Sequence, residues 1–132
     1  MALKTPIVLV ASFMVAAVTA VSSAAPPPAP HVTEVIVLDV GAHMQKFLEL
    51  TKRMDAIQSK YQSTGKAHIW QGSWAGSESG HVIVTVEYPS LLSLAQSEDR
   101  TRGAPELASL IAELDASGIR VLSESLVTEV SR

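Results

Sequence analysis

The chain has 132 residues, a formal net charge of −3 and no cysteine. A mildly acidic chain without a basic stripe is a poor nucleic-acid binder. The lack of cysteine excludes disulfides, thiolate metal sites and a cysteine nucleophile, so stability must come from the core or from a partner subunit.

The N-terminal segment has the organisation of a secretory signal peptide. Residues 1–25 carry one charge, at Lys4, before an almost wholly apolar run from Ile7 to Val21. Ser22 and Ala24 then fit the −3 and −1 positions of a cleavage site. We therefore expect residues 1–24 to be a signal peptide and the protein to be periplasmic or secreted, with no stable membrane insertion after cleavage. A retained anchor is the alternative, because the apolar run is about long enough to span a bilayer.

A proline-rich linker, residues 25–31, separates this segment from the rest of the chain. Consecutive prolines fix φ and cannot donate backbone hydrogen bonds, so this linker should be extended and solvated. Residues 32–132 are then a single domain, because they are too few for two.

The first half of this domain predicts a strand, a helix and a hairpin. His31 to Val40 is rich in Val and Ile, which is typical of a strand, and Gly41 ends it. From Met44 to Tyr61, apolar residues recur at spacings of three and four, which predicts a helix. Lys66 to Ala75 and His81 to Tyr88 alternate as strands on either side of a glycine-flanked turn, which predicts an antiparallel hairpin.

The second half predicts two short helices and a final strand. Ser90 can cap a helix that runs to Arg100, Pro105 suits the first turn of the next helix, and Ile119 to Val130 is the last strand. The order is βαββαβ, the α+β, ferredoxin-like arrangement of a four-stranded antiparallel sheet with the helices on one face. Because the strands carry apolar residues on both faces, the open face needs a cover, and a second copy of the chain would supply it as a homodimer.

One segment resembles a known superfamily. The run from Val84 to Leu91, VTVEYPSL, followed by a Leu- and Ala-rich helix and a long last strand, resembles NIPSNAP-like and related small proteins of the dimeric α/β-barrel superfamily. The resemblance covers Val32 to Val130. It implies a dimer with a pocket between sheet and helices, in a superfamily that includes cofactor-free quinone-forming monooxygenases, haem-degrading monooxygenases and isomerases. The haem-degrading members use an Asn that this chain lacks entirely.

The candidate site residues gather on one strand face. Under strict alternation, His68, Trp70 and Trp74 share a face of their strand. An aromatic pocket with an imidazole as base would suit a small apolar or aromatic ligand. The alternative is a packed sheet face whose indole and imidazole groups are hydrogen-bonded. We take His68 and Trp70 as catalytic candidates, and as ligand-binding candidates Trp70, Trp74, Tyr88 and His81.

No metal or other cofactor is expected. His43 and His81 have no Asp or Glu at a ligand spacing. The chain also lacks a Gly-x-Ser-x-Gly motif, a phosphate loop and a dinucleotide fingerprint, so hydrolase, kinase and dehydrogenase interpretations lose support. Glu34 and Asp39 lie on opposite faces of the first strand; a carboxylate that faces the pocket would be a proton-transfer candidate, and exposed strand-end charge is the alternative.

Two hypotheses for the function follow. The first is an exported dimer that binds a small apolar or aromatic ligand or is purely structural. The second is a cofactor-independent monooxygenase acting on an aromatic or quinone-like substrate, which rests on the resemblance together with His68 and Trp70. An apolar cavity would favour binding, whereas an interior filled by side chains would favour a structural protein.

Overall fold

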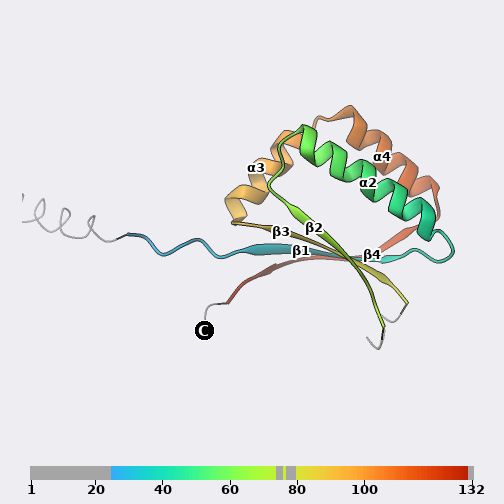
Figure 1. Ribbon diagram of the computed structural model, residues 1–132, viewed down its shortest axis with the longest axis horizontal. Helices are drawn as coiled ribbons and strands as arrows, with labels where there is room; N and C mark the ends of the chain where they lie inside the picture. The colour runs from blue at the N-terminus through green and yellow to red at the C-terminus, as the bar shows by residue number, and fades with distance from the viewer. Residues whose placement is uncertain (1–24, 74–75, 77–79, 131–132) are drawn as a thin grey trace, which may run out of the picture.

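Four strands and three helices form the part of the chain that the computed structural model describes, residues 25–73, 76 and 80–130. The strands are all antiparallel and follow the order β2-β3-β1-β4. Figure 1 shows the helices together on one face of the sheet. The ferredoxin-like fold predicted from the sequence is confirmed, with its second crossover divided into two helices. In chain order the elements are β1 (Val32–Asp39), α2 (Met44–Lys60), β2 (Lys66–Gln71), β3 (Val82–Tyr88), α3 (Leu91–Thr101), α4 (Pro105–Ala116) and β4 (Arg120–Thr128).

Local sequence signals set the helix boundaries close to the predicted positions. Ser90 is the N-cap of α3, and its Oγ accepts a hydrogen bond from the Ser93 backbone N–H at 3.1 Å. Pro105 occupies the first turn of α4, where its missing N–H would have no intrahelical partner. Gly118 follows α4 with a φ of +83°, a left-handed conformation that glycine adopts without strain. Strand β2 ends at Gln71, earlier than the predicted Ala75.

The pairing register assigns each strand residue to a sheet face. On the face toward the helices, Ile36 of β1 lies opposite Val84 of β3 and Glu124 of β4. Strand β4 contains a bulge, because Ser123 pairs with Val37 whereas Val121 pairs with Leu38, which leaves Leu122 as the extra residue. The bulge places Val121 and Glu124 on the same face despite their odd and even numbers.

Two separate apolar clusters attach the helices to the sheet. The first packs α2 and α4 over one end of the sheet through Leu38, Val40, Phe47, Leu50, Ile57, Val82, Leu110 and Ile119. The second seats α3 over the other end through Val32, Val86, Tyr88 and Leu94. Val84, near the middle of β3, packs against both clusters. The core therefore has two attachment regions with the centre of the sheet between them.

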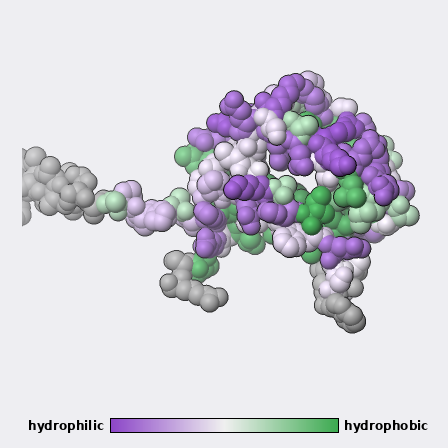
Figure 2. Space-filling view, in the orientation of Figure 1, coloured by the Kyte–Doolittle hydropathy of each residue, from purple (hydrophilic) through white to green (hydrophobic). Residues whose placement is uncertain are grey.

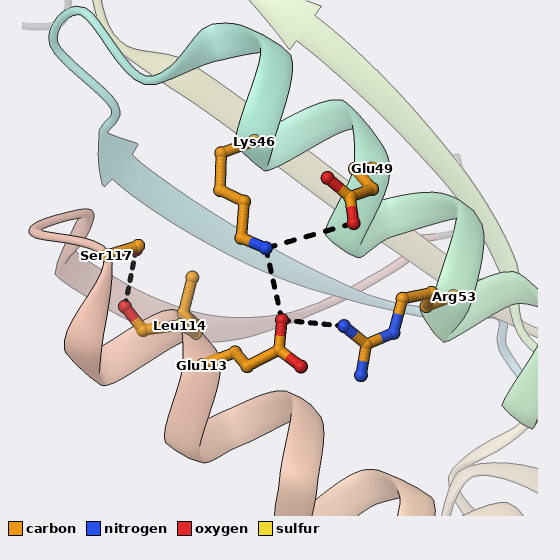
Figure 3. Close-up of polar contacts among 6 residues, drawn as sticks. All are labelled: Lys46, Glu49, Arg53, Glu113, Leu114 and Ser117. Carbon is orange, nitrogen blue, oxygen red and sulfur yellow. Dashed lines mark hydrogen bonds and ion pairs between the residues drawn. The ribbon is translucent and has the colours of Figure 1, made fainter.

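Ion pairs join α2 to α4 along their outer side (Figure 3). Lys46 Nζ and Arg53 Nη1 both donate to Glu113 Oε2, at 3.1 Å and 2.7 Å. Two turns of α4 earlier, Glu106 pairs with Lys60 and accepts a hydrogen bond from the Tyr61 hydroxyl at 2.9 Å. The Lys60 ammonium is the main reason that the pKa of Glu106 falls to about 2. These exposed pairs add little stability individually.

Gly65, which precedes β2, lies against the Tyr88 ring in the second cluster. A Cβ at this position would lie 2.8 Å from Val86 Cγ1 and 2.9 Å from Tyr88 Cε1. We expect Gly65→Ala to lower the free energy of unfolding by about 1–3 kcal/mol, the usual range for overpacking, as measured by urea denaturation. Gly103→Ala is the matched control, because no atom would lie within 4 Å of its Cβ. Equal loss of stability in both variants would contradict the packing argument.

Candidate ligand-binding cavity

The centre of the sheet, beneath the helices, is only half buried. Ile36 and Val84 are partners on the two inner strands, where full burial would be usual, yet neither is fully buried. A cavity of about 330 Å³ lies over them. Its floor is the sheet and its roof is formed by α2 and α4, and its apolar lining includes Ile36, Leu38, Phe47, Leu50, Met54, Ala67, Ile69, Val84, Val86, Leu110, Leu114 and Val121.

The cavity continues into a shallower groove beside α2 and β2. Thr51, Asp55 and Ile69 line both the cavity and this groove. Ile69 is 43% exposed and Leu48, also in the groove, is 37% exposed. Figure 2 shows hydrophilic side chains over the helical layer and hydrophobic ones at the level where helices and sheet meet. The groove therefore gives the cavity a partly apolar entrance.

Three carboxyl groups supply the charge of the cavity lining. They are Glu34 of β1, Asp55 of α2 and Glu124 of β4, and the described lining holds no Lys, Arg or His. Glu34 is opposite Leu126 whereas Glu124 is opposite Ile36, so the two glutamates are diagonal neighbours on one sheet face. Burial raises the pKa of Glu34, and the charges of Glu124 and Glu98 raise it further.

Tyr88 lies on the same sheet face as Glu34, because Val32 pairs with Tyr88 and Glu34 with Val86. Its side chain is buried in the second cluster. Burial, followed by the charges of Glu34 and Glu98, raises the pKa of Tyr88 to about 12. The phenol is therefore a neutral neighbour of Glu34 at physiological pH.

The structure brings His68 and Trp70 together, but outside the cavity. Their ring centroids are 6.0 Å apart, and Trp70 Nε1 donates a hydrogen bond to Thr85 Oγ1 at 2.9 Å. His68 and Trp70 pair with Thr85 and Ile83, which face away from the helices. Trp70 remains 55% exposed on this open sheet face. The predicted sharing of a face by His68 and Trp70 is confirmed, whereas a role for either residue in the cavity is not supported by their position.

The other predicted ligand-binding residues do not join this pair. Tyr88 lies on the opposite sheet face from Trp70, so these two ligand-binding candidates do not share a surface. His81 precedes β3 near Asp39, whose pKa is lowered mainly by a hydrogen bond from Arg120 and also by the charge of His81. Trp74 lies outside the described residues.

The sequence pattern of β1 already marks Glu34 as unusual. Alternation in β1 puts Val32, Glu34, Ile36 and Leu38 on one face, and three of these four are apolar. An ionisable residue that interrupts a core-facing strand is costly to bury unless it has a partner or a use. Within the described residues, the Glu34 carboxylate makes no hydrogen bond or ion pair. Glu34 is therefore the cavity residue most in need of explanation.

Comparisons with known proteins agree with this fold. A NIPSNAP family protein from Agrobacterium tumefaciens matches with a TM-score of 0.57 at 17% identity, over 77% of this chain and 93% of that one. SnoaB, a cofactor-independent oxygenase from Streptomyces nogalater, matches with a TM-score of 0.53 at 12% identity, over 79% and 95%. The chain shares the ferredoxin-like fold of these proteins. At these identities the likeness of this chain to both proteins is one of fold alone.

A third solved structure extends the comparison. A dimeric ferredoxin-like protein from an uncultured marine organism matches with a TM-score of 0.50 at 20% identity, over 78% of this chain and 98% of that one. No family model and no curated protein sequence matches the chain. The ferredoxin-like fold implied by the resemblance of the segment Val84 to Leu91 is thus confirmed.

The described residues offer no group of three metal-binding side chains. None of the described helices combines the length and the apolar character that a bilayer crossing requires. The polar side chains of the described cavity lining are its three carboxyl groups, Thr51 and Gln58.

We expect Glu34→Gln to stabilise the fold at neutral pH. Because the pKa of Glu34 is raised in the folded state, the folded protein binds this proton more readily than the unfolded chain. The stability of the wild type therefore falls as the pH rises above the ordinary pKa of 4.5 and through the raised value. Glutamine resembles the protonated form and lacks this penalty.

Thermal unfolding at about pH 4 and about pH 8 measures the effect, because these values bracket the titration. The melting temperature of Glu34→Gln should exceed that of the wild type at the higher pH, and the difference should shrink at the lower pH. Asp115→Asn, at an exposed position on α4, is the control and should show no such pH-dependent gain. A difference for Glu34→Gln that stays constant with pH would contradict the assignment.

Proposed function

We propose that the protein is exported and acts as a homodimer that binds a small apolar or aromatic ligand in the cavity between the sheet and the helices. The observation that carries the proposal is the half-buried pair Ile36 and Val84 beneath a volume of about 330 Å³. The space is partly open to solvent, so its apolar lining contacts water, and an apolar ligand that covers the lining would be stabilised by the hydrophobic effect. The volume falls within the range usual for small-molecule sites.

The open sheet face supports the homodimer. Trp70, Ile83 and Val37 form a cross-strand row of large apolar residues on the face away from the helices. An apolar face of this kind on a soluble domain usually meets a partner. A neighbour with the same fold is described as a dimeric ferredoxin-like protein, which favours a second copy of this chain as the cover.

A cofactor-independent oxygenase acting on an aromatic or quinone-like substrate is the second candidate. It is favoured by Glu34, because a carboxylate with a raised pKa in an apolar cavity is a stronger base toward a bound phenol. The oxygenase among the structural neighbours shares the fold, which agrees with this candidate without selecting it. His68 and Trp70, the catalytic candidates predicted from the sequence, lie on the open face and would take part in an oxygenase reaction only there.

A substitution that fills the cavity tests ligand binding. Ala67 lines the cavity floor from β2, so Ala67→Phe should occupy the space that a ligand needs. We expect the wild type to bind 1-naphthalenemethanol at one molecule per chain in isothermal titration calorimetry, and Ala67→Phe to lose at least about fivefold in affinity. Ala95→Phe, which introduces the same ring on exposed α3, should bind as the wild type does.

The outcomes of this titration separate the candidates. Equal binding by wild type and Ala67→Phe would place the ligand elsewhere and contradict the proposal, as would no binding at all. Oxygen consumption by the wild type with 1-naphthol, lost in Glu34→Gln, would favour the oxygenase over simple binding.

Native mass spectrometry of protein recovered after export tests the assembly and the processing together. We expect a dimer whose subunits lack residues 1–24. Trp70→Glu should shift it to monomer, because a carboxylate on the open face would be buried unpaired in the interface. Ile111→Glu, at an exposed apolar position on α4, is the control and should stay dimeric. A wild-type monomer would refute the sheet-to-sheet assembly, and a retained N-terminal segment would refute cleavage.

A further inference from the structure

We infer that the cavity selects organic cations: its ligand is a small amine whose ammonium group lies between Glu34 and Glu124 and whose apolar body covers the sheet centre at Ile36 and Val84. This inference rests on the proposed ligand-binding function and specifies the chemical class of the ligand. It follows from the distribution of the charged residues and from the positions of Glu34 and Glu124. It also follows from the cost of leaving a carboxylate in an apolar wall without an ionic partner.

The acids of the outer surface and the acids of the cavity differ in their ionic partners. Several acids on the outer surface have cationic partners: Glu113 contacts Lys46 and Arg53, and Glu106 contacts Lys60. Asp39 likewise pairs with Arg120 at 2.6 Å. The three acids of the cavity have no such partner, since its described lining contains no cationic side chain. The cavity therefore presents an uncompensated negative potential, and a cationic ligand would balance it.

The two glutamates lie where one ammonium group can meet both. They are diagonal neighbours across β1 and β4 and share the sheet face that forms the cavity floor. An ammonium group carries three N–H donors and no acceptor, so it can serve two carboxylates at once. From this position, a ring attached to the ammonium would extend over Ile36 and Val84 toward Ala67 and Ile69.

The third acid, Asp55, lies at the entrance. It lines both the cavity and the outer groove, beside Ile69 and Thr51. The groove also carries Glu49, Lys46 and Lys52, so its two acids are balanced by two lysines. Selection between cations and anions would therefore act inside the cavity, at Glu34 and Glu124.

Each class of ligand should bind differently for a physical reason. A cation removes the repulsion between the glutamates and gains charge-assisted hydrogen bonds, which are stronger than neutral ones. A neutral alcohol of the same shape gains only the apolar contacts and ordinary hydrogen bonds. An anion meets like charges on an apolar wall, which opposes binding. The apolar body should contribute equally to all three, so the head group alone decides their order.

Three probes with one ring system test this order: 1-naphthylmethylamine, 1-naphthalenemethanol and 1-naphthoate, each titrated calorimetrically into the purified protein at neutral pH. We expect the amine to bind at least about tenfold more tightly than the alcohol, and the naphthoate to bind more weakly than either. Glu34→Gln should reduce the preference for the amine over the alcohol at least about fivefold while leaving affinity for the alcohol nearly unchanged. Asp115→Asn removes the same charge from α4, outside the cavity, and should retain the full preference.

The outcomes test this inference separately from the proposed function on which it rests. Equal affinity for amine and alcohol, or a preference that survives in Glu34→Gln, would overturn selection of cations and leave binding of an apolar ligand intact. A preference lost equally in Asp115→Asn would show that net charge alone attracts the amine, and would overturn the role of the cavity acids. Failure of all three probes to bind would overturn the inference and the proposed function together.

Discussion

Two apolar clusters hold the helical layer at opposite ends of the sheet, and the helices bridge the space between them. The first fixes α2 and α4 through residues such as Phe47 and Leu110, and the second fixes α3 through Leu94 against Tyr88. Ion pairs between α2 and α4 join the helices on their outer side, away from the sheet. The cavity lies between the two attachment regions, with α2 and α4 as its roof and Ile36 and Val84 in its floor.

This arrangement also accounts for a charged residue in a core-facing strand. A glutamate beneath a tightly packed helix would lack both solvent and a partner, at a cost of several kcal/mol. Glu34 instead borders the cavity and keeps partial access to water or to a ligand. The raised pKa of Glu34 reflects the incomplete solvation that remains. Both the packing and the electrostatics of the cavity thus affect Glu34, and the proposals for function involve Glu34 for this reason.

The fold was predictable from local patterns, whereas the site was not. Apolar spacing from Met44 onward, the Ser90 cap and Pro105 each act within a few residues, so the sequence alone locates the helices. Alternation also predicts which residues share a face within β2 and which share a face within β3. It does not relate the faces of the two strands to each other. Whether Tyr88 shares a face with Trp70 depends on the register between the strands, which alternation within either strand leaves open. The cavity depends on how far the helices stand from the sheet, a property of the whole packing.

The bulge in β4 has a consequence for how this domain can vary in length. Leu122 is the extra residue between Val121 and Ser123, whose partners Leu38 and Val37 are adjacent on β1. A chain without Leu122 would run through the same hydrogen-bonding partners as a regular strand, with Val121 still over the cavity and Ser123 still on the open face. Strand β4 can therefore lose one residue in evolution without exchanging the side chains of its two surfaces, whereas a deletion elsewhere in its paired stretch would invert one part of the strand relative to the other.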